Sequence, residues 1–522
     1  MLKKYFVPWL LLILCITACT PNTAGTPTTS GTGNTASTGK EASQPVQTDL
    51  VVGLEADAAT MLANTQQNYV TDVQIRNIYD ALIDRDAKGE LVPGLATEWK
   101  NVNDLTWELT LQDGVTFHNG APFTADDVKF SIEYILDEKN KSFYRTRWKD
   151  VKEVKVIDPH KVQIVTTQPF PTILQRMADD ILIMSAAYVA EVGIEKAASQ
   201  PIGTGAYTFV KWSRDESLQL AANEAYWRGA PAIKKLTFRY IPEFSTRLSA
   251  LLSGEVHLIK NIPVDSVDSV KNTPSTKVET VESARINFII LNSMYNGPLK
   301  DQKVRQAISY AVDIDGILNA VLNGYGKRMT GPLPDFNLEY VKTEGYAYDP
   351  DKAVQLLKEA GYEPSSLELQ LDTPSGRYPM DSHVAQAIAS QLQKIGIKVN
   401  VQVNEWGTHV NKLLQKEMKD MYLLGSGPVF EAQGTMVNYF TKDSPFSGYT
   451  DADMDKTILE LAATVDPGKR QEAFAYLQKR VVEEAAWIPL WQQRDIYGVS
   501  DKLDFQPRAD EKLVVSQMKW LP

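Results

Sequence analysis

The chain has 522 residues and a formal net charge of −11. A single hydrophobic core stops growing near ~250–300 residues, so two or more lobes are expected. The acidic balance argues against a nucleic-acid partner and against a basic membrane-binding surface. A hydrophobic share of 43% and a charged share of 23% are typical of globular proteins.

The first residues have the features of a secretory signal peptide. Lys3 and Lys4 precede an apolar run over residues 6–16. This run is shorter than the roughly 20 residues that a membrane-spanning helix needs. The segment ends in Ile-Thr-Ala-Cys, which resembles a bacterial lipobox, a signal whose cysteine takes a diacylglycerol and becomes the new N-terminus. We therefore expect a signal peptide over residues 1–18 and a lipid on Cys19, with a plain signal peptide as the alternative.

Residues 19–49 predict a flexible tether behind that lipid. The segment consists mainly of Thr, Ser, Gly, Asn and Pro and has no aromatic residue, so it cannot bury a core. Both cysteines of the chain lie at or before Cys19. The mature chain is therefore expected to have no disulfide framework.

Residues 107–136 predict a strand hairpin that leads into a capped helix. Apolar and polar residues alternate over 107–111, and residues 115–117 are expected to form a short second strand. Thr124 and Asp127 have the spacing of a capping box in front of an apolar helical face.

The rest of the chain alternates between helical and strand patterns. Helices are expected at 73–83, after Asp301, after Asp349-Pro350 and from 384 to 395. Strands are expected at 50–54, 151–157, 162–167, 286–292 and 397–403. This alternation favours an α/β fold.

The segment 113–128 carries a resemblance to a known family. It reads Asp-Gly-Val-Thr-Phe-His-Asn-Gly-Ala-Pro-Phe-Thr-Ala-Asp-Asp-Val and is closely similar to the signature of the family 5 extracytoplasmic solute-binding proteins. These are the receptors of dipeptide, oligopeptide, nickel and glutathione ABC importers. Shorter similarities at 77–83, 91–99, 201–207, 223–229 and 304–313 extend the resemblance over about 50–522.

The resemblance implies an α/β, two-lobe periplasmic-binding-protein-like fold with the ligand cleft between the lobes. It implies lobe I at 50–285 with a subdomain inserted at about 84–199, lobe II at 286–485, and a return to lobe I at 486–522. Hinge strands are expected near 283–292 and 485–492.

Sequence patterns of catalysis are absent. The five histidines form no H-x-H or H-x-x-x-H pair, and the chain has neither a G-x-S-x-G elbow nor a Walker A loop. We expect no enzyme activity, no cofactor and no metal site. A hydrolase that uses two distant carboxylates would leave no such pattern.

The first candidate ligand segment is 373–379, between a predicted strand and a predicted helix, where α/β lobes present ligand loops. It resembles the S-G-R-Y-P-x-D segment of the family, whose arginine often faces a ligand carboxylate. An arginine fork matches a carboxylate bidentately, so Arg377 and Tyr378 are candidates. The alternative for Arg377 is a surface-loop charge.

The second candidate segment is 425–434. Peptide-binding members typically carry G-W-x-x-D here, and the aspartate holds the peptide amine. This chain has Gly425 and Ser426, with Val429 in place of the aspartate and Glu431 two positions further on. The departure allows an anionic ligand, a metal chelate, or a peptide that is held differently.

Three further residues are candidates by position. Asn68 and Tyr69 lie in a region that lines the cleft in related proteins, and Arg145, near Arg147, is a cation within reach of a cleft. The alternative for these arginines is a solvated charge at a helix end.

The leading hypothesis is a monomeric receptor of an ABC importer, anchored by its lipid to the outer face of the cell membrane. It would capture peptides or peptide-like solutes and deliver them to a membrane permease that works with cytoplasmic ATPases. One alternative is a receptor for a non-peptide solute, such as a metal chelate or a glutathione-like anion. Others are a peptide-sensing receptor without transport and a secreted hydrolase.

Overall fold

The computed structural model of the protein describes residues 47–66, 68–427 and 430–522. The expected signal peptide, Cys19, most of the expected tether and Val429 lie outside the described residues. Residues from Gln47 to Pro522 form one compact unit. Within the described part of the chain, no helix combines the length and the apolar character needed to cross a membrane.

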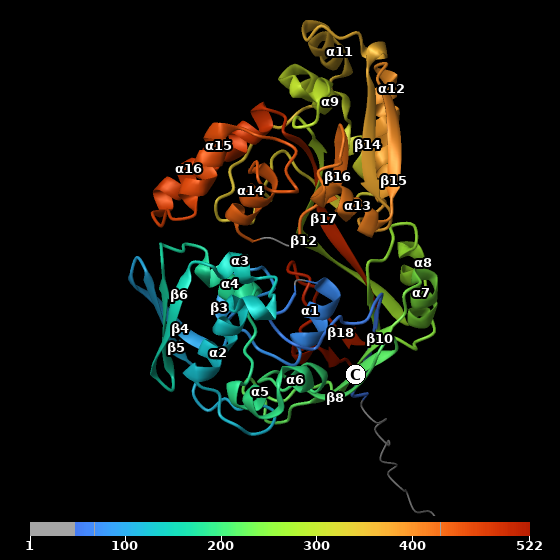
Figure 1. The fold of residues 1–522 in the computed structure, drawn as a ribbon. Coiled ribbons are helices and arrows are strands. Elements are labelled where there is room, and N and C mark those ends of the chain that lie inside the picture. The colour runs from blue at the N-terminus through green and yellow to red at the C-terminus, as the bar shows by residue number, and fades with distance from the viewer. Residues whose placement is uncertain (1–46, 67, 428–429) are drawn as a thin grey trace, which may run out of the picture. The chain divides into compact units, whose positions relative to one another are not determined.

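A large mixed sheet organises the chain (Figure 1). Its strands, in order across the sheet, are β15 (Lys398–Asn404), β14 (Glu368–Pro374), β16 (Met421–Gly425), β12 (Thr276–Leu291), β17 (Trp487–Ser500), β11 (Leu258–Lys260), β1 (Asp49–Leu54), β10 (Lys235–Tyr240), β9 (Ser217–Ala222) and β8 (Tyr207–Ser213). The short strand β13 (Gly326–Arg328) pairs with β17 beside this row. Strand β1 is parallel to β10 and β11, and β14 is parallel to β15 and β16, as in an α/β fold.

Strands β12 and β17 connect the two halves of this sheet. They are antiparallel over almost their full length, from the pair Thr276–Ser500 to the pair Ile290–Trp487. The last part of β17 pairs with β11 in one half of the sheet, whereas the last part of β12 pairs with β16 in the other half. The pairing is irregular between Glu282 and Ile286, where the chain passes from one half to the other. We call the β8–β11 and β1 side the first lobe and the β14–β16 side the second lobe.

Helices cover the sheet in both lobes (Figure 1). Those of the first lobe are α1 (Tyr69–Ile75), α2 (Ala125–Leu136), α3 (Arg145–Trp148), α4 (Ile173–Asp179), α5 (Ala186–Val192), α6 (Ile194–Ser199), α7 (Phe244–Leu252) and α8 (Val267–Lys271). Those of the second lobe are α9 (Gln302–Ala311), α10 (Ile314–Ala320), α11 (Pro350–Glu359), α12 (Asp381–Lys394), α13 (Trp406–Leu414), α14 (Ala432–Phe440), α15 (Ala452–Leu461) and α16 (Pro467–Glu483).

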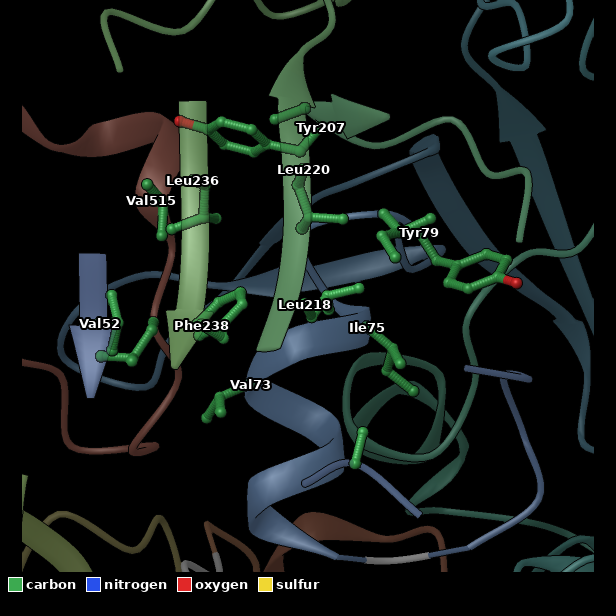
Figure 2. Close-up of a cluster of buried hydrophobic side chains, with 14 of the residues drawn as sticks. Val52, Val73, Ile75, Tyr79, Tyr207, Leu218, Leu220, Leu236, Phe238 and Val515 are labelled. Carbon is green, nitrogen blue, oxygen red and sulfur yellow. The ribbon is translucent and has the colours of Figure 1, made fainter. Parts of the chain in front are cut away.

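The core of the first lobe lies between the sheet and α1. Figure 2 shows apolar side chains of β1, β9 and β10 gathered with those of α1 and of the C-terminal segment. The labelled members are Val52, Val73, Ile75, Tyr79, Tyr207, Leu218, Leu220, Leu236, Phe238 and Val515. Burying a side chain of this kind contributes roughly 1.5–3 kcal/mol, so this cluster fixes α1 and the residues at its ends.

A second, antiparallel sheet lies between residues 96 and 166. Its order is β4 (Ala96–Asn103), β5 (Thr106–Leu111), β7 (Lys161–Thr166) and β6 (Val151–Asp158), and α2 packs against it. Two short pairs, β2 (Ile83–Arg85) with β3 (Leu91–Pro93) and β18 (Leu503–Asp504) with β19 (Lys519–Trp520), complete the strands.

The family-like segment 113–128 forms scaffold around α2. The Asp127 carboxylate accepts a hydrogen bond of 2.9 Å from the backbone N–H of Thr124, which confirms the predicted capping box. The expected second strand at 115–117 is wrong, because the chain makes only an isolated bridge between Thr116 and Pro122. This segment folds back on itself, since the N–H of Phe117 donates to the carbonyl of Ala121.

The helix expected at 73–83 begins and ends earlier than predicted, since α1 spans Tyr69–Ile75. The chain cannot continue as a helix because the carbonyls of Asn77 and Ile78 accept hydrogen bonds from Tyr207 and Gly205. A Cβ on Gly205 would lie 2.5 Å from the Ile78 carbonyl oxygen, so glycine permits this close approach. The Gly-rich turn at 201–207 is therefore structural.

Candidate ligand-binding site

A cavity of about 350 Å³ lies beside the crossing of β12 and β17. It is lined by the end of β1, the start of α1, the loop after β11, the segment before α12, the middle of β17 and the C-terminal segment. Its lining therefore comes from both lobes. Among the described residues, no group of three or more His, Cys, Asp or Glu side chains is arranged to hold a metal ion.

Buried ion pairs form one wall of this cavity. The Lys260 ammonium lies 3.0 Å from the Asp495 carboxylate and 2.9 Å from that of Glu511. Glu511 also pairs with Arg285 at 3.1 Å. All four side chains are buried, and they come from β11, β12, β17 and the C-terminal segment. We call these four residues the hinge network.

The hinge network balances two positive and two negative charges. Burial lowers the pKa of Lys260, but the carboxylates of Asp495 and Glu511 outweigh it and raise that pKa well above its usual value. Burial raises the pKa of Glu511, but Arg285 and Lys260 outweigh it and hold that pKa far below the ordinary range. Burial raises the pKa of Asp495 by more than the positive charge of Lys260 lowers it, so that pKa is raised. The network thus keeps Lys260 and Glu511 charged at neutral pH.

The backbone at the cavity is held in uncommon conformations. Asn261, Met380 and Glu511 line the cavity and have φ values of 62°, 54° and 63°. For residues with a side chain this left-handed region costs on the order of 1 kcal/mol or more, and such residues cluster at functional sites. This clustering marks the cavity as the candidate site on grounds of backbone geometry.

The segment before α12 is fixed by Asp381. Its carboxylate accepts hydrogen bonds from the backbone N–H groups of Gly376, Arg377 and Tyr378 at 3.1, 2.9 and 3.1 Å. These bonds satisfy the Asp381 charge and hold the loop in place. The loop therefore presents the Arg377 side chain from a rigid base.

Arg377 is a free cation in the cavity. Its guanidinium lies 5.2 Å from the ring centres of Tyr378 and Trp406, and it makes no side-chain hydrogen bond or ion pair with the described residues. The side chain keeps exposed surface, yet loss of hydration and then the positive charge of Arg285 lower its pKa. Since arginine normally titrates above ~12, Arg377 remains charged and lacks an anion.

Two other predicted residues lie beside Arg377. Tyr378 lines the cavity, and its hydroxyl donates to the carbonyl of Gly425 at 3.2 Å. A Cβ on Gly425 would lie 2.6 Å from the Tyr378 ring, so Gly425 supports Tyr378 from behind. Tyr69 also lines the cavity, with Lys260 4.3 Å from its ring centre and with its buried hydroxyl lacking a hydrogen-bond partner among the described residues.

The remaining predicted residues have structural contacts away from the cavity lining. Asn68 caps α1, because its side chain accepts hydrogen bonds from Val70 and Thr71. Ser426 accepts a hydrogen bond from Arg285 on its carbonyl. Arg145 forms an exposed ion pair with Glu138.

Glu431 also contacts protein and not the cavity. It caps α14 by accepting a hydrogen bond from Gly434, and it pairs with Arg176 of α4 at 2.8 Å. Arg176 belongs to the first lobe and Glu431 to the second, so this pair joins the lobes at a second place. Burial raises the pKa of Glu431, against the opposing charge of Arg176.

Comparison with known proteins identifies the family. The family model described as bacterial extracellular solute-binding proteins, family 5 Middle, matches residues 90–448. The chain belongs to this family. This agrees with the resemblance of segment 113–128 and with the two-lobe α/β fold.

Several known proteins are similar to the chain over most of their length. The chain is 31% identical over 445 residues to the Probable di/tripeptide-binding protein 5 of Pseudomonas aeruginosa, covering 79% of this chain and 84% of that protein. It is 26% identical over 470 residues to the glutathione-binding protein GsiB of Pectobacterium atrosepticum, covering 87% and 90%. The crystal structure of the ABC transporter substrate-binding protein CtaP of Listeria monocytogenes superposes with a TM-score of 0.84 at 25% identity, covering 91% and 100%.

No pattern in the sequence predicted the hinge network. Lys260, Arg285, Asp495 and Glu511 lie in segments far apart along the chain, and only the folded sheet brings them together. Glu55 was also missed, although a signal existed: it is the first charged residue after the buried strand β1. In α/β folds, side chains beyond the carboxyl end of a strand line ligand sites.

The hinge network makes Glu511 a sensitive position for stability. We expect Glu511→Gln to lower the free energy of unfolding by about 3–5 kcal/mol, because it leaves Lys260 and Arg285 buried with too little negative charge. Urea unfolding followed by tryptophan fluorescence measures this. The control is Glu368→Gln, which removes an exposed pair with Lys398 and should cost at most about 1 kcal/mol. Equal effects of the two changes would contradict the importance of the network.

Proposed function

We propose that this protein is the receptor of an ABC importer and captures short peptides or peptide-like solutes for a membrane permease. Family membership supports the role of a binding protein, since the members are binding proteins and not enzymes. The single observation that carries the ligand class is Arg377, a charged guanidinium without an anion in a cavity lined by both lobes. A carboxylate is the partner that this planar fork matches.

The size of the cavity favours a small ligand. Small-molecule sites commonly have volumes of ~300–1,000 Å³, and about 350 Å³ lies near the lower end. A dipeptide or tripeptide fits this better than a long peptide. The similarity to a di/tripeptide-binding protein supports the same class, while the similarity to a glutathione-binding protein keeps a peptide-like anion as the second candidate.

We also propose the domain boundaries and the mode of attachment that the sequence predicts. Lobe I would comprise 50–285 and 486–522, with 84–199 as its inserted subdomain, and lobe II would comprise 286–485. A lipid on Cys19 would anchor a monomer to the outer face of the cell membrane, and residues 19–49 would act as its tether. The proposal rests on the lipobox-like Ile-Thr-Ala-Cys and on the composition of the tether.

The role of Arg377 is testable by affinity. We expect Arg377→Ala to weaken peptide binding by about 30-fold to several-thousandfold, since removing one partner of a buried charged pair costs about 2–5 kcal/mol. Arg377→Lys should restore only part, because an ammonium lacks the planar fork. Calorimetry with a peptide selected from a synthetic tripeptide library measures both variants.

A thermal melt without peptide is the control for Arg377. Its side chain makes no hydrogen bond or ion pair with the described residues, so the melting temperature should stay near that of the wild type. Unchanged affinity would make Arg377 a surface charge. Reduced affinity together with a much lower melting temperature would give it a structural role.

The lipid anchor is testable by fractionation. We expect Cys19→Ser to release the protein from membranes, because the thiol that would carry the diacylglycerol is lost. Membrane and soluble fractions are compared by immunoblot, and the acyl mass on Cys19 is measured by mass spectrometry. Cys15→Ser is the matched control and should stay membrane-bound. Wild-type protein without acyl mass at Cys19 would contradict the anchor.

Closure of the lobes on ligand is also testable. Strands β12 and β17 are the main-chain connections between the lobes, and the cavity is lined from both, so a bound peptide should favour the closed arrangement. Small-angle X-ray scattering should show a smaller radius of gyration with the peptide. At a hundredfold excess over Kd the peptide should also stabilise the fold by about 2.7 kcal/mol. A peptide that binds without compaction would contradict closure.

A further inference from the structure

The charged side chains around the cavity can be divided by whether the protein itself neutralises them. The acids are Glu55, Asp381, Asp495 and Glu511, and the strong bases are Lys260, Arg285, Arg377 and Arg494. Lys260, Arg285, Asp495 and Glu511 neutralise one another in the hinge network. Asp381 is satisfied by backbone N–H groups, and Arg494 pairs with Glu282 at 3.3 Å. Glu55 and Arg377 are the two charges that remain.

Glu55 has no hydrogen bond and no ion pair from its side chain among the described residues, although it is half-buried. Burial lowers the pKa of Arg247, and the charge of Glu55 acts to raise it. The Arg247 guanidinium donates its hydrogen bonds to the carbonyls of Ile241 and Pro242, at 2.6 and 3.0 Å. No contact within 4 Å joins Arg247 to Glu55 among the described ion pairs. Glu55 is therefore an anion without a direct partner at the cavity.

Glu55 and Arg377 face the same space from opposite lobes. Glu55 follows β1 of the first lobe, whereas Arg377 follows β14 of the second. Burial is the largest effect on the pKa of Arg377, and the carboxylate of Glu55 is among the charges that act to raise that pKa. Burial is also the largest effect on the pKa of Tyr69, and Glu55 acts to raise it as well. Both residues line the cavity, and they form no ion pair with each other among the described residues.

We propose that Glu55 receives the positively charged amine of the ligand while Arg377 receives its carboxylate, so that the site selects dipolar ligands with both groups. The inference rests on the proposed function and adds to it a residue for the positively charged end of the ligand. Tyr69, whose buried hydroxyl has no hydrogen-bond partner among the described residues, also lines the cavity. The segment 425–434 does not supply this residue, because the carboxylate of Glu431 is taken by Arg176.

The test pairs protein variants with changes at the two ends of one peptide. The probe is the strongest binder from a library of tripeptides with uncharged side chains, prepared with free ends, with an acetylated amine and with an amidated carboxylate. We expect Glu55→Gln to weaken the free peptide about tenfold or more but to leave the acetylated peptide unchanged, because that peptide has already lost the ammonium. Arg377→Ala should weaken the free and the acetylated peptide alike and leave the amidated one unchanged.

The matched control is Glu216→Gln, which makes the same chemical change at an exposed glutamate of the first lobe outside the cavity lining. It should leave all three affinities unchanged. If Glu55→Gln has no effect while Arg377→Ala weakens the free peptide, the amine assignment is wrong and the peptide receptor stands. If Glu55→Gln weakens the acetylated peptide equally, the amine assignment is also wrong. If no library member binds wild-type protein, both the proposed function and this inference fail.

Discussion

The two-lobe structure depends on charges buried at the crossing of β12 and β17. Lys260, Arg285, Asp495 and Glu511 are removed from water where four chain segments meet, and each has an opposite charge within about 3 Å. Burying an unpaired ion costs several kcal/mol, so the loss of any one of the four side chains would destabilise the packing of these segments. The network therefore ties the C-terminal segment to the strands that join the lobes, and it includes Asp495 from the middle of β17, which lines the cavity.

The same constraint determines what the cavity offers a ligand. Because the positive and negative charges of the hinge network neutralise one another, the network contributes little net charge to the cavity. The charges that can select a ligand therefore lie outside the network. Arg377 stands on a loop whose own backbone N–H groups bind Asp381, so the acid nearest to Arg377 in sequence is unavailable to it. The protein thus fixes the position of the Arg377 loop without neutralising the Arg377 charge. Preorganised binding of a carboxylate needs this arrangement.

Local chemistry made much of the fold predictable. Thr124 with Asp127, Asp301 and Asp349 act as helix caps through contacts of a few residues, and the structure confirms each. The predicted strands at 151–157, 162–167 and 397–403 correspond to β6, β7 and β15.

The predictions that failed depended on distant partners. The expected helix at 73–83 ends at Ile75 because residues 205 and 207 take its carbonyls, and the expected strand at 115–117 finds no neighbouring strand to pair with. Of the candidate site residues, Arg377, Tyr378 and Tyr69 line the cavity, and the family resemblance together with their position between a strand and a helix pointed to them. Lys260 and Glu511 could not be found this way, because no local pattern links them.

The departure at 425–434 explains why the polarity of the site differs from the expected pattern. Ser426 is buried, and its carbonyl and hydroxyl oxygens accept hydrogen bonds from the Arg285 side chain and the Ile286 backbone. The Glu431 carboxylate forms an ion pair with Arg176 of the first lobe. Among the described residues that line the cavity, the second lobe therefore contributes the free cation Arg377, whereas the acid without a partner, Glu55, belongs to the first lobe.

Such a division of charge has a consequence for selectivity. If Arg377 and Glu55 bind the ligand as proposed, a ligand with only a carboxylate would satisfy Arg377 but would enclose the Glu55 charge without a partner when the lobes close. A purely cationic ligand would leave the Arg377 charge without a partner in the same way. Each mismatch costs the desolvation of one uncompensated ion, whereas a dipolar ligand avoids both costs. Under this proposal, closure around the correct ligand and rejection of simple anions would have the same physical origin. Glu55 and Arg377 approach the cavity from opposite lobes with opposite charges, and a ligand that bears both partners would satisfy both.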